Sequence, residues 1–191
     1  MKHTVVAMVE DRPGVLTRVA SLFRRRGFNI DSLAVGATEE QGISRMTIVV
    51  DGDHGILQQV EHQLFKLIDV VKVTNLSKED AVSRELALIK VRCGTLHRRE
   101  VLDIVEIFRA QVIDVSPATL IIQVVAEEER LNALLDNLKP YGVMEMVRTG
   151  RIAMARGEQT SAIRKEESDE VLRFHTESGR RPEGKLPYVS K

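Results

Sequence analysis

Residues 4–16, TVVAMVEDRPGVL, set how the first part of the chain folds. The first six are β-branched or apolar, which predicts a buried strand. In the turn that follows, Asp11 can cap a helix, and Pro13 suits the first helical turn because no intrahelical N–H is needed there. Apolar residues at helical spacing then predict a helix that stops at Gly27. These residues are Val15, Leu16, Val19, Leu22 and Phe23.

The remainder of residues 1–77 completes one supersecondary unit. Two apolar segments, 30–37 and 44–50, flank a turn rich in Thr, Glu, Gln and Gly, and they predict a β-hairpin. Asp53 can cap a second helix, and residues 70–76 predict a fourth strand. The order βαββαβ is that of a ferredoxin-like domain, in which two helices cover one face of an antiparallel sheet.

A similar order of elements returns after residues 77–84, a polar segment expected to be a linker. The sequence therefore predicts an α+β protein with two ferredoxin-like βαββαβ domains, at 1–77 and 84–157. Identity between the two units is poor, so the prediction rests on the order of elements alone. The second unit is expected to contain a strand at 86–91, a helix at 100–109, a hairpin of 111–115 and 119–126, a helix at 129–138 and an extended segment at 143–155.

Residues 158–191 lack the apolar periodicity of the preceding segments. They are charged, balanced in sign and interrupted by Gly and Pro, which predicts a flexible tail. Within it, Val171, Leu172 and Phe174 form a small apolar group that can dock on a partner.

The composition argues against several classes of protein. Its 28 basic and 28 acidic residues leave no basic surplus of the kind that nucleic-acid binding favours. The single Cys93 excludes an intramolecular disulfide and fits a reducing cytosol. The start of the chain does not resemble a signal peptide, and no apolar stretch approaches the ~20 residues of a membrane span. We expect a soluble, cytoplasmic protein that contacts neither nucleic acid nor membrane.

The sequence contains none of the catalytic or metal motifs that we sought. The five histidines include no HExxH, and there is no CxxC to supply zinc ligands. Dinucleotide, P-loop and GxSxG fingerprints are also missing. The acidic run 127–129 favours a helix start and the basic run 24–26 a helix end, so neither requires a catalytic role. We therefore expect no catalytic site and no metal site.

Gly14 is unusual, because the fold predicted from the sequence gives no reason for a glycine at this position. A glycine in a first helical turn costs roughly 0.5–1 kcal/mol relative to alanine. A ligand could, however, approach the bare backbone there, because free N–H groups at a helix N-terminus attract a carboxylate. Val15, Leu16 and Ile30 could form a small apolar pocket beside it. The alternative is that Pro13-Gly14 is only a turn, and composition leaves both interpretations open.

Several segments of the sequence resemble a known family. VEDRPGVLTRVASLFRRRGFNIDSLAVG (9–36), followed by SRMTIVV (44–50), resembles the ACT domain of acetolactate (acetohydroxyacid) synthase small subunits. Within it, RGFNIDSL (26–33) is unusually specific for this family. In the second unit, EIFRAQVIDV (106–115) is similar to the family's EIFR…IDV segment. The resemblance covers residues 3–157 and leaves out the tail.

The resemblance implies where an effector would bind. ACT domains typically bind amino acids at the loop between the first strand and the first helix, usually at a dimer interface. Gly14 corresponds to the family's effector-loop glycine, and Asn29 to the polar residue that reaches the effector across the interface. Asp11 stands where some members carry Asn; it can accept from an ammonium group but cannot donate to a carboxylate. The expected effector site comprises Asp11, Pro13, Gly14, Val15, Leu16, Asn29 and Ile30.

The resemblance also implies a function. The chain would be a homodimeric regulatory subunit without catalytic activity of its own. It would activate a catalytic large subunit that carries thiamine diphosphate, magnesium and FAD and condenses pyruvate with pyruvate or 2-oxobutyrate. It would confer feedback inhibition by valine, or by leucine or isoleucine, on branched-chain amino-acid biosynthesis.

Three other hypotheses remain. A free-standing ACT sensor for another enzyme or a transcription factor would bind the effector without stimulating acetolactate synthase. A nickel-responsive DNA-binding regulator would need more ligands than His97 and Cys93, and a small enzyme would turn over alone. The segment 26–33 and the resemblance across both domains favour the acetolactate synthase subunit.

Overall fold

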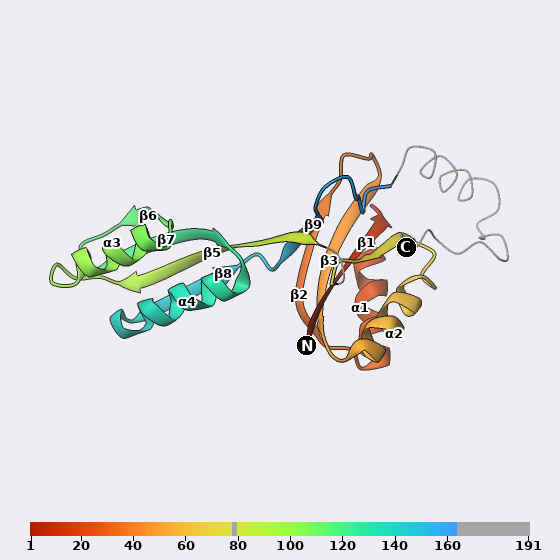
Figure 1. Cartoon of the computed structure of the whole chain (residues 1–191), viewed down its shortest axis with the longest axis horizontal. Coiled ribbons are helices and arrows are strands. Elements are labelled where there is room, and N and C mark those ends of the chain that lie inside the picture. Colours follow the sequence, from red (N-terminus) through yellow and green to blue (C-terminus); the bar gives the residue numbers. More distant parts are fainter. Residues whose placement is uncertain (78–79, 164–191) are drawn as a thin grey trace. The chain divides into compact units, whose positions relative to one another are not determined.

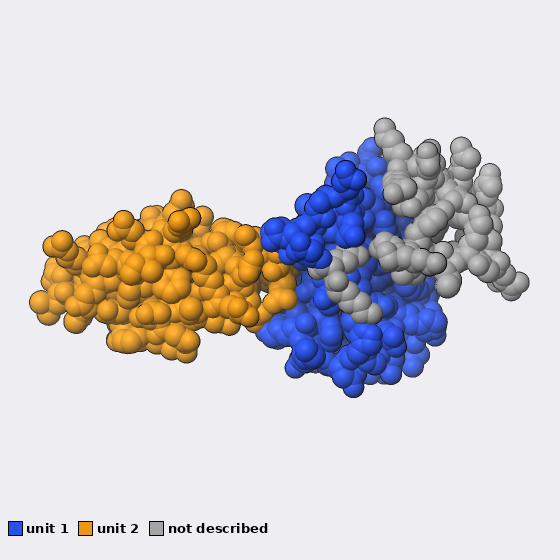
Figure 2. Space-filling model, viewed as in Figure 1, with its two compact units in different colours: residues 1–82, 153–191 blue, residues 83–152 orange. Residues whose placement is uncertain are grey.

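The computed structural model describes residues 1–77 and 80–163, which fall into two compact units (Figures 1 and 2). Unit 1 begins at Met1, and the chain leaves it after Val82. Unit 2 comprises residues 83–152, after which the chain returns to unit 1 at Ala153. The range 84–157 inferred from the sequence thus includes five residues that the structure places in unit 1. The expected apolar docking group at 171–174 lies outside the described residues.

Unit 1 has the predicted βαββαβ order. Its antiparallel sheet has the strand order β2-β3-β1-β4, so that β2 forms one edge. The elements are β1 (Lys2–Glu10), α1 (Val15–Arg26), β2 (Ile30–Ala37), β3 (Ile43–Asp51), α2 (His54–Leu64) and β4 (Val70–Asn75).

The core of unit 1 lies between one face of the sheet and the two helices, as the alternation along the strands requires. Val5, Ala7 and Val9 of β1 point into it and are at most 1% exposed. The predicted helix boundaries are confirmed at two sites. The side chain of Asp53 accepts a hydrogen bond from Ile56 N (2.9 Å), and Gly27 ends α1 in the left-handed conformation at φ 70°.

Unit 2 repeats the order with the strand order β6-β7-β5-β8. The elements are β5 (Ala81–Arg92), α3 (Arg98–Ile107), β6 (Gln111–Val115), β7 (Thr119–Ala126), α4 (Glu128–Leu138), the 3-10 turn η1 (Lys139–Tyr141) and β8 (Val143–Arg148). A further strand, β9 (Ile152–Ala155), pairs with β5. The two ferredoxin-like domains of the predicted α+β class are therefore confirmed.

Two details of the second unit differ from the prediction. The segment 77–84, expected to be a linker, is already part of a strand from Ala81 onward. This strand, β5, is extended because it pairs with β9, the strand in which the chain returns from unit 2. The extended segment at 143–155 is divided into β8 and β9, and Gly150 between them has a φ of 83° that a continuous strand does not allow. Cys93 is a buried free thiol in the core of unit 2, as expected.

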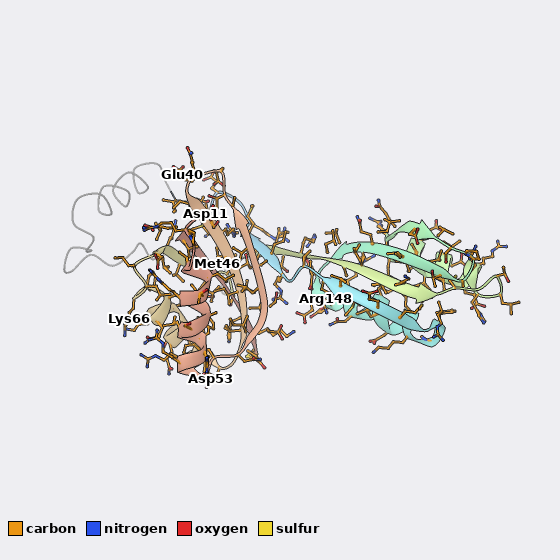
Figure 3. The ribbon with its side chains drawn as sticks, turned by 180° about the vertical axis from the view of Figure 1, so that it is seen from behind. Asp11, Glu40, Met46, Asp53, Lys66 and Arg148 are labelled. Carbon is orange, nitrogen blue, oxygen red and sulfur yellow. The ribbon has the colours of Figure 1, made fainter. Side chains whose placement is uncertain are left out.

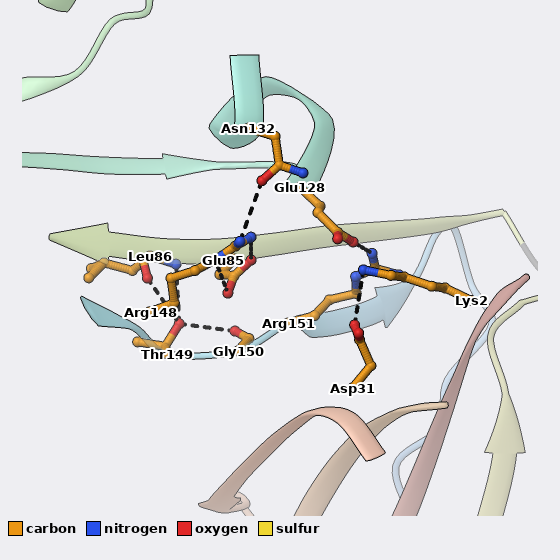
Figure 4. Close-up of polar contacts among 10 residues, drawn as sticks. All are labelled: Lys2, Asp31, Glu85, Leu86, Glu128, Asn132, Arg148, Thr149, Gly150 and Arg151. Atoms are coloured by element: carbon orange, nitrogen blue, oxygen red, sulfur yellow. Dashed lines mark hydrogen bonds and ion pairs between the residues drawn. The ribbon is translucent and has the colours of Figure 1, made fainter. Parts of the chain in front are cut away.

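A partly buried ion pair links the neighbouring strands β5 and β8 of the unit 2 sheet. Arg148 of β8 donates from Nε and Nη2 to the two carboxylate oxygens of Glu85 on β5, at 2.9 and 2.5 Å. A third donor, Arg148 Nη1, lies 3.4 Å from Asn132 Oδ1 on α4 (Figure 4). This bidentate geometry helps to fix the register of β8 against β5.

Candidate effector site

The β1–α1 turn has a conformation that requires glycine. Gly14 is the residue before the helix, with φ 91° and ψ −12°, a left-handed conformation that costs other L-residues free energy. Helix α1 starts only at Val15, so the predicted capping role of Asp11 and the helical position of Pro13 are wrong. The backbone N–H of Asp11 instead donates to the carbonyl of Gly42 in the β2–β3 turn (2.8 Å). The β1–α1 turn is therefore bonded to the β2–β3 turn at this residue.

The start of α1 is open to a ligand. No side chain caps it, and within residues 1–77 and 80–163 the backbone N–H groups of Leu16 and Thr17 have no acceptor. A Cβ placed on Gly14 would meet no atom within 4 Å, so the space in front of the turn is empty. Unpaired N–H groups together with the helix dipole make this position attractive to an anion such as a carboxylate.

Two buried carboxylates, each paired with an arginine, hold the turn in place. Arg18 on α1 donates from Nη1 to both oxygens of Asp69, at 3.0 and 2.8 Å, and Arg12 pairs with Glu10. The backbone links the two carboxylate residues, since Glu10 N donates to Asp69 O (2.9 Å). The sequence analysis assigned no role to these four residues. The Arg18–Asp69 pair joins elements 51 residues apart and therefore leaves no periodic signal in the sequence.

The apolar residues of the expected site divide between core and surface. Val15 is 4% exposed and belongs to the core of unit 1, whereas Leu16 is 46% exposed and borders the open helix start. Pro13 is exposed on the turn, and Ile30 is partly buried against the same core. Leu16 and Pro13 are thus the apolar side chains of the expected site that are accessible to a ligand at the start of α1.

Asn29 and Ile30 lie at the opposite end of the sheet from the turn. Ile30 is opposite Val50, which pairs with His3 near the start of β1, whereas the turn follows the end of β1 at Glu10. Helix α1 runs from the turn back toward Asn29, and its 12 residues span about 18 Å. Figure 3 shows Asp11 at one end of unit 1 and Asp53, which follows β3, at the other. One chain therefore does not bring the two halves of the expected site together.

Other kinds of site find no support in the part of the chain that is described. Among these residues, no three His, Cys, Asp or Glu side chains are grouped so that they could hold a metal ion. Over the same residues, no helix combines the length and apolar character needed to cross a membrane. The acidic residues 127–129 surround the start of α4 and the basic residues 24–26 form the last turn of α1, as predicted.

Sequence comparisons match each of the two units to a known family. Residues 6–72 match the family described as the small subunit-like ACT domain of AHAS, and residues 84–157 match the family described as the small subunit of acetolactate synthase. The probable acetolactate synthase small subunit of Archaeoglobus fulgidus is 50% identical over 157 residues, covering 82% of this chain and 98% of that protein. The acetolactate synthase small subunit of Mycolicibacterium smegmatis is 51% identical over 155 residues, covering 81% and 91%.

A solved structure shares the architecture. The crystal structure of the acetolactate synthase small subunit from Thermotoga maritima matches with a TM-score of 0.77 and 42% identity, over 83% of this chain and 99% of that one. The match includes both βαββαβ units, and the sequence similarity extends across the β1–α1 turn. The chain belongs to the acetolactate synthase small-subunit family.

Proposed function

We propose that this chain activates the catalytic subunit of acetolactate synthase and makes it sensitive to a branched-chain amino acid, with valine as the first choice. The open start of α1 carries the proposal. It combines a left-handed Gly14, unpaired N–H groups and the half-exposed side chain of Leu16. A carboxylate and an aliphatic side chain are the two features that such a surface complements.

A two-fold dimer completes the proposed site. The turn and Asn29 lie at opposite ends of α1, so a two-fold axis near the middle of the helix would place each turn against Asn29 and Ile30 of a second copy. The edge strand β2 carries backbone groups that an antiparallel β2 of the second copy can pair with. Two equivalent effector sites per dimer follow from this symmetry.

Each part of the effector has a proposed partner. The N–H groups near Gly14 bind the carboxylate, and the aliphatic side chain packs between Leu16 of one chain and Ile30 of the other. Asp11 is exposed and accepts from the ammonium group together with the Asn29 amide oxygen. The carboxylate of Asp11 also repels the effector's own carboxylate, so we expect lower affinity than in relatives that carry Asn there.

In this proposal the catalytic partner, and not this chain, carries out the condensation reaction. That subunit would supply thiamine diphosphate, magnesium and FAD for the condensation of pyruvate with a second 2-oxoacid, and this chain would have no turnover alone. Inhibition requires that the effector bind one state of the complex more tightly than another. A coupling of ~1–3 kcal/mol per effector is typical and would be sufficient.

The decisive experiment uses two nearly isosteric substitutions at one position. Asn and Asp both tolerate the left-handed conformation of Gly14 better than other residues, so Gly14→Asn and Gly14→Asp should fold alike. Only Gly14→Asp puts a negative charge where the carboxylate would bind. We expect it to weaken valine binding by about tenfold or more relative to Gly14→Asn. Calorimetry on the chain and activity of the reconstituted holoenzyme measure this.

Several outcomes would decide against the proposal. Full valine inhibition of the holoenzyme with Gly14→Asp would exclude the site. Effector binding without any stimulation of the catalytic subunit would favour a free-standing ACT sensor of another enzyme or a transcription factor. Family membership makes this alternative the weaker one.

A further inference from the structure

The sheet of unit 1 is covered on its second face by a segment that returns from unit 2. Residues 153–163, here named the strap, lie on the side opposite the helices. Ala153, Ala155 and Ile163 of the strap pack on a separate apolar cluster. The sheet contributes to this cluster Val6, Met8, Ile43 and Val71, which alternate with core residues along the strands.

Two cationic side chains of the sheet hold the strap. Arg45 of β3 donates from Nη1 to Ser161 Oγ (2.8 Å) and from Nη2 to the carbonyl of Ala153. Lys72 of β4 donates from Nζ to the carbonyl of Ala162 (2.9 Å). Arg45 and Lys72 are the cross-strand neighbours of Met8 on its two sides, so both ends of the strap are bound across one row of the sheet.

The hydrogen bonds from Arg45 and Lys72 to the strap can be exchanged for hydrogen bonds to water. Arg45 and Lys72 bind neutral oxygens of the strap, and burial lowers the pKa of Arg45, an effect that Glu39 partly offsets. Water can replace neutral acceptors around a cation far more easily than it can replace a buried apolar contact. The strap is held by these hydrogen bonds and by the small apolar contacts of Ala153, Ala155 and Ile163, so it can detach while the core on the other face stays intact.

The strap is also close to the effector turn through β3. Asp11 N donates to Gly42 O, and the next residue, Ile43, is buried in the cluster beneath the strap. Arg45 follows two residues later on the same strand. A ligand that tightens the turn therefore acts on the first residues of the strand that holds the strap.

The strap is also the segment that directly follows unit 2 in the chain. The chain enters that unit through β5 and leaves it through β9, and these strands pair with each other. Next to them, Arg156 N donates to Asp80 O (2.8 Å), and the Arg156 side chain forms an ion pair with Asp80 (3.0 Å). A shift of the strap is thus transmitted to one of the two strands that connect the units.

We propose that the strap is a latch that the effector controls: occupancy of the β1–α1 turn changes how firmly residues 153–163 are held on the sheet by Arg45 and Lys72, and this signals to unit 2. The inference rests on the proposed effector function and adds its route. The latch is tested by the energetic coupling between the effector and the strap.

The first test uses the full wild-type chain. Hydrogen exchange of the amides in 153–163 is measured with and without valine, and a change of about fivefold or more is expected. Valine binding, by calorimetry, with no change in this exchange would overturn the latch and leave the effector site in place. Absence of valine binding to the wild type would instead overturn the proposed function, and the latch with it.

The second test removes the two donors. Arg45→Met with Lys72→Met leaves the strap carbonyls unbonded, so its amides should exchange about tenfold faster or more. The holoenzyme should keep its basal activity and its valine binding but lose most of its valine inhibition. Lys66→Met, at an exposed lysine of the same unit, is the matched control, and Arg45→Lys should restore part of the response. Full inhibition in the double variant, or unchanged exchange of its strap, would refute the latch.

Discussion

The β1–α1 turn of unit 1 and the β5–α3 turn of unit 2 occupy the same place in the βαββαβ order. In unit 1, the helix start is bare and follows the left-handed Gly14. In unit 2, the guanidinium of Arg98 fills the corresponding place and donates to the carbonyls of Cys93, Ser116 and Pro117 at 3.2, 2.7 and 3.0 Å. The same turn of the fold thus has an uncapped helix start in one unit and an arginine that binds three carbonyls in the other.

The two units differ again at the far ends of these helices. Both helices end with the same pair of backbone hydrogen bonds and a left-handed residue. That residue is Gly27 after α1 but Arg109, at φ 54°, after α3. Unit 1 therefore has the unstrained ending, and unit 2 bears a side chain in a conformation that costs free energy.

The second faces of the two sheets also contrast. The strap covers that face in unit 1, whereas in unit 2 Val125 and Val147 are each 56% exposed. They are opposite Leu86 and Leu88 on β5, which alternate with the buried Ala87 and Ile89. In unit 1 the chain's own strap thus covers the second face of the sheet, while unit 2 keeps apolar side chains exposed on that face.

The largest expected effect tests whether the units fold separately. Leu134 on α4 is fully buried in the core of unit 2, so Leu134→Ala should destabilise this unit by about 2–5 kcal/mol. Leu64→Ala is the matched change in the core of unit 1. Hydrogen exchange should show each loss of protection in its own unit, and valine affinity should fall only with Leu64→Ala. Equal losses in both units would show a single cooperative body.

An intermediate effect is expected from removing the Arg98 guanidinium at the β5–α3 turn of unit 2. Arg98→Met leaves the carbonyl of Cys93 before α3 and those of Ser116 and Pro117 in the β6–β7 turn without their donor, so unit 2 should lose about 1–3 kcal/mol. Arg99→Met, at the exposed neighbour, should change the free energy of unfolding little. Urea unfolding measures both. Valine affinity should be unchanged, and a decrease with Arg98→Met would mean that effector binding also depends on unit 2.

The smallest effect concerns the helix endings. Arg109→Gly should stabilise unit 2 by about 0.5–1 kcal/mol, because glycine adopts the left-handed conformation without strain. Gly27→Ala should destabilise unit 1 by a similar amount for the converse reason. Thermal unfolding compares the two variants. Destabilisation by Arg109→Gly would indicate that the Arg109 side chain makes contacts that outweigh its backbone strain.

Local patterns in the sequence predicted most of the elements. β2, β6 and β7 have the predicted bounds, since their apolar runs are enclosed by strong turn signals. The prediction failed at the start of α1, where Asp11 and Pro13 suggested a helix two or three residues too early. A glycine that accepts φ 91° allowed the chain to turn once more before the helix, and composition does not distinguish these two paths.

What could be read from the residues alone was the order of strands and helices, the importance of Gly14 and the family, because strand alternation, helical spacing and capping operate over a few neighbouring positions. Tertiary structure decided the rest. Arg45 meets Ser161 across 116 positions, Lys72 meets Ala162 across 90, and Asn29 lies a helix length away from the β1–α1 turn of its own chain. Such contacts depend on how the sheet folds back on the chain, and no local pattern specifies them.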